Sequence, residues 1–289
     1  MSEARFRVHL VDGTLELFRC FHGAPRAQAT DGREVGAARA LTHSFLKLVR
    51  KDGATHVAVV FDSIVDGGRD RKDRSDGALL RSQFPLAADV ARALGLVVWP
   101  MTRFQADEGI STGAARYAAD PSVEQVVICS TDKDFAQCVR GEQVVLFDRS
   151  KGKVTDEAGV VERFGVGPSR IPELFALIGD VSDGLPGIPG WGPKSAVALL
   201  LRYDSLEDVP EDLDDWDVEI RGKARLAATF RERYREVLLQ RDLSVRRCDL
   251  PIRDEPADLE WMGADRALLT ELVERIGVEG VMERVPRWR

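Results

Sequence analysis

The chain has 289 residues and a formal net charge of −7 at pH 7, and 44% of its residues are hydrophobic. Its longest apolar runs are too short to cross a bilayer, and its N-terminus lacks the apolar core of a secretory signal. We therefore expect a cytoplasmic protein without a membrane partner. The negative charge argues against a nucleic-acid partner, unless the acids are gathered to hold cations.

The first part of the chain alternates short apolar runs with helical patterns, which predicts an α/β fold with a mostly parallel twisted sheet. We expect strands at residues 6–11, 55–61, 96–99, 123–129 and 144–147. Helices are expected at residues 35–49, 87–94 and 106–119. From about residue 171 only helices are expected, at residues 173–178, 195–201, 224–239 and 264–276. We place the domain boundary there, with a core at residues 1–170 and a helical lobe at residues 171–289.

The four cysteines are Cys20, Cys129, Cys138 and Cys248, and they lie far apart in the sequence. No CxxC pair and no Cys/His zinc spacing is present. We interpret them as reduced thiols in a reducing compartment.

Three acids each stand directly after the last apolar residue of a predicted strand: Asp12, Asp62 and Asp132. Because parallel sheets form their sites at the carboxyl ends of the strands, these carboxylates are expected at one sheet edge. Taken singly, Asp12 with Gly13 also fits a turn, and Asp132 also fits a helix N-cap.

Further acids complete a candidate set of oxygen ligands for Mg²⁺, which prefers carboxylates and usually keeps several waters. Asp180 and Asp183 are spaced i, i+3, and Asp132 and Asp134 flank Lys133. Asp107 and Glu108 open a predicted helix, where acids also stabilise the helix dipole.

Glycine and proline are concentrated in LPGIPGWGPKSA at residues 185–196, between two predicted helices. Small residues allow a tight turn with exposed amides, and Pro193 suits the first turn of a helix. Such amides can hold a DNA phosphate without reading bases, although an ordinary interhelical loop has the same composition.

These segments together resemble the bacterial 5′-3′ exonuclease and flap endonuclease family, which includes the N-terminal 5′ nuclease domain of DNA polymerase I. The resemblance lies in LVDGTLELFRCFH (residues 10–22), VAVVFDS (57–63), STDKDFAQCV (130–139) and GDVSDGLPGIPGWGPKSA (179–196). These segments follow one another in the family's order.

The resemblance implies a PIN-like core, a helical arch near residues 66–84 and a helix–three-turn–helix DNA-binding motif in the helical lobe. It also implies two or more Mg²⁺ or Mn²⁺ ions and a K⁺ ion at the hairpin of residues 187–192. The implied metal ligands or their supports are Asp12, Asp62, Gln105, Asp107, Glu108, Asp132, Asp134, Asp180 and Asp183. The implied DNA contacts are Arg19, Arg69, Lys72, Arg74, Gly187, Gly190, Gly192, Lys194 and Ser195.

The chain departs from the family pattern at two places. The family usually has Glu-Ala-Asp-Asp where this chain has Gln105-Ala106-Asp107-Glu108, so the first ligand is neutral. The arch element Tyr-Lys-x-x-Arg is represented by Gly77, Ala78 and Arg81, and the basic stretch before it is either a DNA contact or a solvated loop.

The expected activity is 5′-3′ exonuclease and flap endonuclease cleavage of DNA during replication and repair, by a monomer without a polymerase domain. Asp12 and Asp62 would serve at the metal ions, and Arg81 and Lys133 would stabilise the phosphate charge. The expected partners are 5′ flaps and branched or nicked duplexes. Two alternatives stay open: a DNA-binding protein of the same fold with weakened catalysis, and a ribonuclease.

Overall fold

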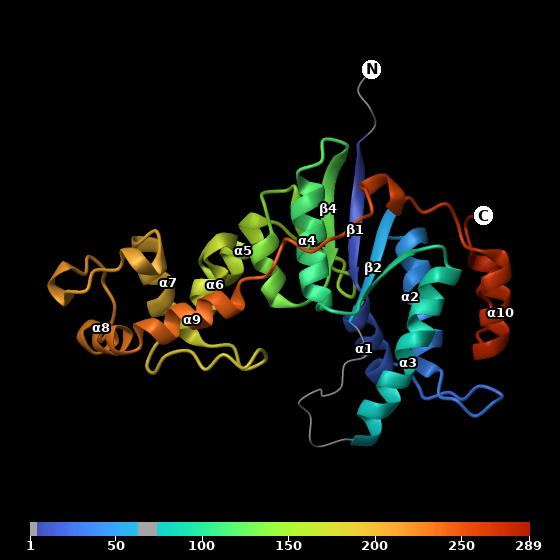
Figure 1. Ribbon diagram of the computed structural model, residues 1–289, viewed down its shortest axis with the longest axis horizontal. Coiled ribbons are helices and arrows are strands. Elements are labelled where there is room, and N and C mark those ends of the chain that lie inside the picture. The colour runs from blue at the N-terminus through green and yellow to red at the C-terminus, as the bar shows by residue number, and fades with distance from the viewer. Residues whose placement is uncertain (1–4, 63–73) are drawn as a thin grey trace. The chain divides into compact units, whose positions relative to one another are not determined.

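The computed structural model describes residues 5–62 and 74–289 and divides the chain into two compact units (Figure 1). The first unit comprises Met1–Ser130, Phe147–Gly152 and Cys248–Arg289, and the second comprises Thr131–Leu146 and Lys153–Arg247. Within the described residues, no helix is both long and apolar enough to cross a membrane. Each unit is made of segments that do not follow one another in the chain. The single boundary predicted near residue 170 stays a prediction.

The first unit is built on parallel strands in the order β3-β2-β1-β4. The strands are β1 (Phe6–Asp12), β2 (His56–Asp62), β3 (Val97–Met101) and β4 (Val123–Cys129). Six of the seven β2 residues are buried, as expected for a parallel strand that is covered on both faces. The parallel sheet predicted from the sequence is confirmed.

Helices cover both faces of this sheet, because successive strand residues point to opposite sides. Val59 and Phe61 lie against Gly13 at the start of α1 (Gly13–Gly23), whereas Val60 lies against Gly109 of α4 (Ala106–Ala118). The remaining helices of the unit are α2 (Gly36–Arg50), α3 (Arg74–Ala93) and α10 (Arg266–Ile276). A Cβ at Gly13 would lie within 2.8 Å of both Val59 and Phe61, so glycine permits this close approach.

Two helices of the first unit differ from the sequence prediction. α1 begins directly after Asp12, where Asp12–Gly13 also fitted a turn, because the Asp12 carboxylate caps the helix by accepting from Leu15 N at 2.8 Å. α3 begins at Arg74 rather than near residue 87, and Pro85 lies inside it. Because Pro85 has no N–H, the carbonyl of Arg81 lacks its usual helical partner.

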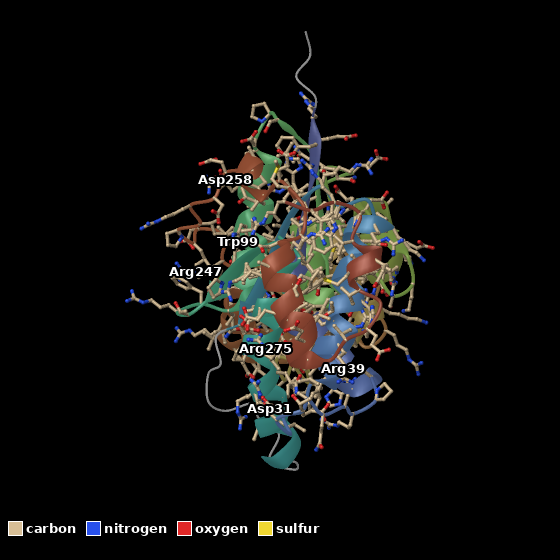
Figure 2. All side chains as sticks on the ribbon, turned by 90° about the vertical axis from the view of Figure 1, so that its right-hand side faces the viewer. Asp31, Arg39, Trp99, Arg247, Asp258 and Arg275 are labelled. Atoms are coloured by element: carbon tan, nitrogen blue, oxygen red, sulfur yellow. The ribbon has the colours of Figure 1, made fainter. Side chains whose placement is uncertain are left out.

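The last segment of the chain completes the first unit rather than extending the helical part. Arg39 Nε donates to the carbonyl of Ile276 at the end of α10, and Arg275 pairs with Asp89 of α3 at 2.6 Å. Figure 2 labels the two arginines. Cys248–Arg289 therefore pack within the first unit.

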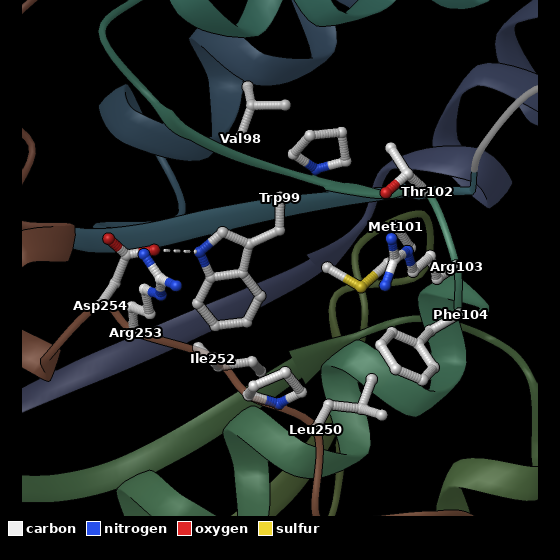
Figure 3. Close-up of a pocket in the computed structure, with 12 residues that line it drawn as sticks. Val98, Trp99, Met101, Thr102, Arg103, Phe104, Leu250, Ile252, Arg253 and Asp254 are labelled. Atoms are coloured by element: carbon white, nitrogen blue, oxygen red, sulfur yellow. Dashed lines mark hydrogen bonds between the residues drawn. The ribbon is translucent and has the colours of Figure 1, made fainter.

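A pocket of about 320 Å³ lies between β3 and the extended stretch that follows Cys248 (Figure 3). Trp99, Met101, Phe104 and Leu250 provide apolar walls, and Trp99 Nε1 donates to Asp254 Oδ2 at 2.7 Å.

The second unit is mainly helical. Its elements are a short 3₁₀ helix η1 (Lys133–Cys138), the strand β6 (Lys153–Thr155), and the helices α5 (Glu157–Phe164), α6 (Ile171–Ile178), α7 (Pro193–Arg202), α8 (Lys223–Glu232) and α9 (Tyr234–Ser244). Strand β5 (Val144–Asp148) precedes β6 in the chain. Where one helix was expected over residues 224–239, the chain forms α8 and α9, which meet at Arg233.

An aromatic cluster in this unit joins Trp191 of the glycine-proline segment to two rings from later in the chain. Trp191, Trp216 and Phe230 have ring centroids 6.1 to 6.4 Å apart. Both indoles have acceptors for their N–H groups: Leu226 O for Trp191 and Pro210 O for Trp216. Burying these rings with satisfied N–H groups stabilises the unit through a large apolar area.

Candidate metal centre and nucleic-acid interface

The first unit places Asp12 and Asp62 at the carboxyl ends of adjacent parallel strands, as predicted from their positions in the sequence. Asp12 Oδ2 accepts from Ser130 Oγ at 3.0 Å, and the N–H of Asp62 donates to Thr14 Oγ1 at 2.9 Å. The side chains of both acids are half-buried. Two carboxylates therefore meet the same sheet edge, each held by neighbouring hydroxyl or amide groups.

The start of α4 lies at this edge as well, because Asp62 Oδ1 accepts from Ala106 N at 2.7 Å. Gln105 is the exposed N-cap of α4, and its N–H donates to Glu108 Oε2 at 2.9 Å. Asp107 Oδ1 accepts from the N–H of Glu108 at 2.7 Å. The segment from Gln105 to Glu108, which was predicted to carry metal ligands, is thus also the capped start of α4. Its acids fit both interpretations, as metal ligands and as acids that stabilise the helix dipole.

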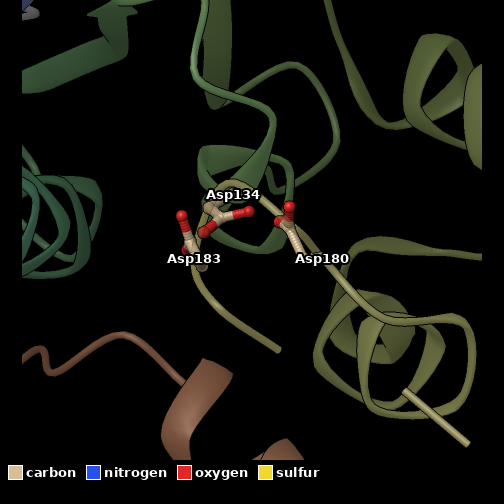
Figure 4. A group of neighbouring side chains, drawn as sticks. All are labelled: Asp134, Asp180 and Asp183. Atoms are coloured by element: carbon tan, nitrogen blue, oxygen red, sulfur yellow. The ribbon is translucent and has the colours of Figure 1, made fainter. Parts of the chain in front are cut away.

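The second unit gathers Asp134, Asp180 and Asp183, which offer carboxylate oxygens within 4.8 Å of one another. Figure 4 shows the three carboxylates turned toward one another, with Asp134 between the other two. Asp134 lies on η1, whose N-cap Asp132 accepts from Asp134 N at 3.0 Å. Asp134 and Asp180 are buried and Asp183 is exposed, so the group opens to solvent on one side.

The crowding of these acids shifts their protonation. Burial, a hydrogen bond with the Asp183 carboxyl and the charge of Asp132 raise the pKa of Asp134 to about 7, although Arg246 acts in the opposite direction. Burial also acts to raise the pKa of Asp180, but hydrogen bonds from Lys133 and Ser182 lower it below its usual value. Carboxylates crowded in this way are stabilised when a cation lies between them.

Two cationic side chains contact the group. Lys133 Nζ lies 2.5 Å from Asp180 Oδ2 and donates to Ser182 Oγ at 2.7 Å. Burial opposes protonation of Lys133, but its contacts with Asp180 and Asp134 raise its pKa overall. Arg246 contacts Asp134 and lies 3.1 Å from Asp183 Oδ2. Lys133 was predicted as a site residue, whereas Arg246 was missed because it lies more than 60 positions further along the chain.

The donor set suits a divalent cation such as Mg²⁺. The group presents only oxygen ligands, and the buried Oδ1 of Asp134 makes no hydrogen bond within the described part of the chain. Hard divalent ions prefer oxygen ligands, and this Asp134 oxygen is available as one of them.

The glycine-proline segment forms a hairpin between α6 and α7. Asp180 and Leu185 exchange two backbone hydrogen bonds of 2.8 Å, and Ile188 N donates to the carbonyl of Leu177 at 3.0 Å. Gly187 has φ +65°, and a Cβ there would lie 2.4 Å from Gly179 N. Only glycine allows the two backbone segments to approach so closely.

The predicted DNA contacts of the hairpin have different environments. The amide of Gly187 donates to the buried Gln240 Oε1 at 2.8 Å, so it is already used inside the unit. Gly190 is exposed and Gly192 is half-buried at the N-cap of α7. Lys194 is exposed and Ser195 half-buried in the first turn of that helix.

Arg225 of α8 is a further basic residue beside the hairpin, and no pattern in the sequence pointed to it. Its Nη2 lies 3.4 Å from the position that a Cβ on Gly190 would take. Within the described residues, its guanidinium makes no ion pair, so it remains available to an anion.

The other predicted basic residues are less well placed by the structure. Arg19 is half-buried on α1 and lies 3.6 Å from Glu16 Oε1. Arg81 is exposed on α3. Arg69 and Lys72 lie outside the described residues, as does the first part of the predicted arch at residues 66–73, and only the backbone of Arg74 is described.

Comparison with known proteins gives the family. The model of the 5′-3′ exonuclease N-terminal resolvase-like domain matches residues 7–165, and that of the 5′-3′ exonuclease C-terminal SAM fold matches residues 166–267. The chain therefore belongs to the 5′-3′ exonuclease family. The predicted PIN-like α/β core and the predicted helical lobe are confirmed at the level of the fold.

Individual relatives agree with this assignment. DNA polymerase I of Bacillus caldotenax is 30% identical over 292 residues, covering 96% of this chain and 32% of that protein. The 5′-3′ exonuclease of Aquifex aeolicus is 27% identical over 288 residues, covering 97% of this chain and 95% of that protein. The chain thus spans about a third of the length of the DNA polymerase I relatives that it matches.

A solved structure shares the fold. The structure of the bacteriophage T5 5′-exonuclease with bound zinc ions has a TM-score of 0.65 and covers 96% of both chains, at 16% identity.

Proposed function

We propose that this protein is a structure-specific 5′ nuclease that hydrolyses DNA phosphodiesters by 5′-3′ exonuclease and flap endonuclease cleavage. The observation that carries the proposal is the group of Asp134, Asp180 and Asp183 within 4.8 Å of one another, in a chain of the 5′-3′ exonuclease family. The names of the relatives, a 5′-3′ exonuclease and DNA polymerase I, support DNA as the substrate.

We propose Mg²⁺ or Mn²⁺ as the cofactor, held by Asp134, Asp180 and Asp183 in the second unit. Asp132 supports this group from its position before η1. Asp12, Asp62 and the Gln105, Asp107 and Glu108 segment are proposed as ligands or supports in the first unit. When bound, such ions activate a water molecule and stabilise charge on phosphate oxygens.

The chain's own residues orient and neutralise the phosphate. Lys133 has a pKa raised above its usual value, so it stays protonated and can face phosphate charge while it fixes Asp180. Ser182 orients the other oxygen of Asp180 through its N–H and its hydroxyl, at 3.0 and 2.5 Å. Arg81 is proposed as a further cation toward the phosphate.

We propose that the hairpin between α6 and α7 holds the phosphate backbone of duplex DNA. The exposed Lys194 lies in the first turn of α7, where backbone N–H groups and the helix dipole favour an anion. Arg225 places a second guanidinium beside Gly190, and Ser195 adds a hydroxyl. A K⁺ ion bound by carbonyls of residues 187–192 belongs to the same proposal, as do Arg19 and the basic residues before α3.

One alternative is favoured by a particular residue. Gln105 offers a neutral amide at the exposed N-cap of α4, where the family usually has a glutamate. If that position is needed for metal binding, the protein would bind DNA with weak cleavage.

A substrate panel tests the proposal. The protein is incubated with 5′-labelled flap DNA, a nicked duplex, a blunt duplex and single-stranded RNA, each with Mg²⁺, with Mn²⁺ and with EDTA. We expect metal-dependent cleavage near the base of the flap, weaker cleavage of the blunt duplex and no cleavage of RNA. Binding of flap DNA without cleavage under any metal condition would favour the alternative, and preferred cleavage of RNA would contradict the proposal.

A further inference from the structure

An arginine side chain shares the oxygens of the proposed metal site. The Nη2 atom of Arg246 lies 3.1 Å from Asp183 Oδ2 and also contacts Asp134 Oδ2. The Arg246 side chain is only 16% exposed, so this contact is shielded from bulk water. A partly buried ion pair of this kind is screened far less by salt than one on the surface.

The position of Arg246 is held by a side chain of the same short helix that carries Asp134. Gln137 of η1 accepts from the backbone N of Arg246 at 2.9 Å through its Oε1. The Nε2 of the same side chain donates to the carbonyl of Ser244, at the end of α9, at 3.0 Å. Gln137 therefore clamps the segment that leads into Arg246 on both sides of Val245.

The contacts leave a direct conflict between the guanidinium and a divalent ion. Asp134 and Asp183 use their Oδ2 atoms for Arg246, and Asp180 uses its Oδ2 atom for Lys133. A divalent ion bound by these carboxylates, whether through the same oxygens or through the Asp134 Oδ1 atom that makes no hydrogen bond among the described residues, would lie beside the guanidinium, where like charges repel. The ion and Arg246 cannot both keep these contacts at full strength.

We propose that Arg246 is a built-in counter-cation that competes with the divalent ion for Asp134 and Asp183. It thereby sets the metal concentration at which the acidic group becomes loaded. Without metal, the guanidinium limits the repulsion among the carboxylates. The inference rests on the proposed metal-dependent function, because it assigns the ion to these acids.

The test is a titration of metal binding without DNA. Isothermal titration calorimetry with Mn²⁺ compares the full-length wild type, Arg246→Gln and Arg235→Gln. Arg235 is exposed near the start of α9 and makes no ion pair in the part of the chain that the structure describes, so it controls for loss of one charge. We expect Arg246→Gln to lower the Kd for Mn²⁺ at least about tenfold, which corresponds to about 1.4 kcal/mol, and Arg235→Gln to change it less than about twofold.

A Kd for Arg246→Gln equal to or above that of the control would overturn the proposal. Gln137→Ala provides an independent variant that keeps the arginine but removes its clamp. We expect Gln137→Ala to lower the Kd by a smaller factor and Arg246→Lys to restore most of the wild-type value. If circular dichroism shows that Arg246→Gln does not fold, an unchanged Kd in Gln137→Ala overturns the proposal.

Cleavage of flap DNA, measured in parallel at saturating Mn²⁺, separates this inference from the proposed function. If the wild type cleaves no DNA while Arg246→Gln binds Mn²⁺ more tightly than the wild type, the nuclease assignment is refuted and the proposed competition stands. If the wild type cleaves flap DNA and all variants have the same Kd for Mn²⁺, the proposed competition is refuted and the nuclease assignment stands.

Discussion

At the scale of single residues, Asp134 is buried and interacts with Asp183, Asp132 and Arg246, and its pKa is raised to about 7. The folded state therefore holds a proton that the unfolded chain releases near pH 4. Between these values the folded state binds more protons, so the contribution of Asp134 to stability falls as the pH rises from about 4 to 7.

Replacing Asp134 by Asn removes this contribution, so we expect the variant to gain stability relative to the wild type across that pH range. The gain should reach on the order of a few kcal/mol at pH 7, since one pKa unit corresponds to about 1.36 kcal/mol. Urea unfolding in EDTA at pH 4 to 7 measures it. Burial lowers the pKa of His9 to about 4, which has the opposite effect on stability, so the difference between the two proteins is compared. A difference that does not change with pH would contradict the assignment.

Gln105 is the residue where the chain departs most clearly from its family. If Gln105 lies within reach of a metal ion, Gln105→Glu adds an attractive charge and should lower the Mg²⁺ concentration for half-maximal cleavage several-fold. If Gln105 only begins α4, the substitution should change stability by a few tenths of a kcal/mol through the helix dipole and leave cleavage unchanged. Metal titrations of cleavage by both proteins distinguish these results, and superimposable curves would remove Gln105 from the site.

For single residues, the sequence predicted which residue types make up the candidate site better than it predicted which side chains contact one another. The acids after predicted strands could be found because a parallel sheet brings its strand ends to one edge. Arg246 could not be found, because nothing in its spacing to Asp134 or Asp183 marks a contact between distant segments. The amide of Gly187 was expected to face DNA, but the contact with Gln240 is a tertiary feature that local sequence does not encode.

At the scale of elements, the hairpin between α6 and α7 depends on glycine at one position and not at another. Gly187 has a positive φ and contacts the Gly179 backbone, whereas Gly192 has φ −130° and open space around it. Gly187→Ala should cost about 2 to 4 kcal/mol of unfolding free energy through backbone strain and overlap. Gly192→Ala should cost less than about 1 kcal/mol. Urea unfolding of both variants tests the pair, and equal losses would contradict this account of the hairpin.

The same hairpin predicts how DNA binding responds to salt. Lys194→Ala and Arg225→Ala should each reduce the slope of log K against log salt by about one unit, because each removes one phosphate contact. Lys153→Ala removes an exposed charge on β6 and should leave the slope unchanged. Fluorescence anisotropy with two duplexes of different sequence measures the slopes. A strong preference for one duplex, or slopes that do not change in either hairpin variant, would speak against phosphate recognition here.

Elements were predicted well where apolar periodicity is strong and less well where charge or proline interrupts it. The buried strands around Val59 and Val127 were found, whereas α1 was missed because Asp12–Gly13 also has the composition of a turn. The start of α3 was missed because its first turns are polar and Pro85 suggests a break.

At the scale of the whole molecule, a net charge of −7 is compatible with a DNA partner because part of the acidic charge is gathered in small groups. Lys194 and Arg225 provide positive charge at the hairpin in spite of the overall balance. The pI of the chain is therefore a poor guide to its ligand, and the placement of charge is a better one.

The most direct test of the central claim measures cleavage and binding of 5′-flap DNA by the wild type and by Asp134→Ala with Asp180→Ala. With Mg²⁺, we expect the double variant to lose cleavage by at least about three orders of magnitude, while its affinity for the flap stays within several-fold of the wild type. EDTA should abolish cleavage by the wild type. Cleavage by the double variant at the wild-type rate, in the same metal and on the same substrate, would show that these carboxylates do not form the catalytic metal centre.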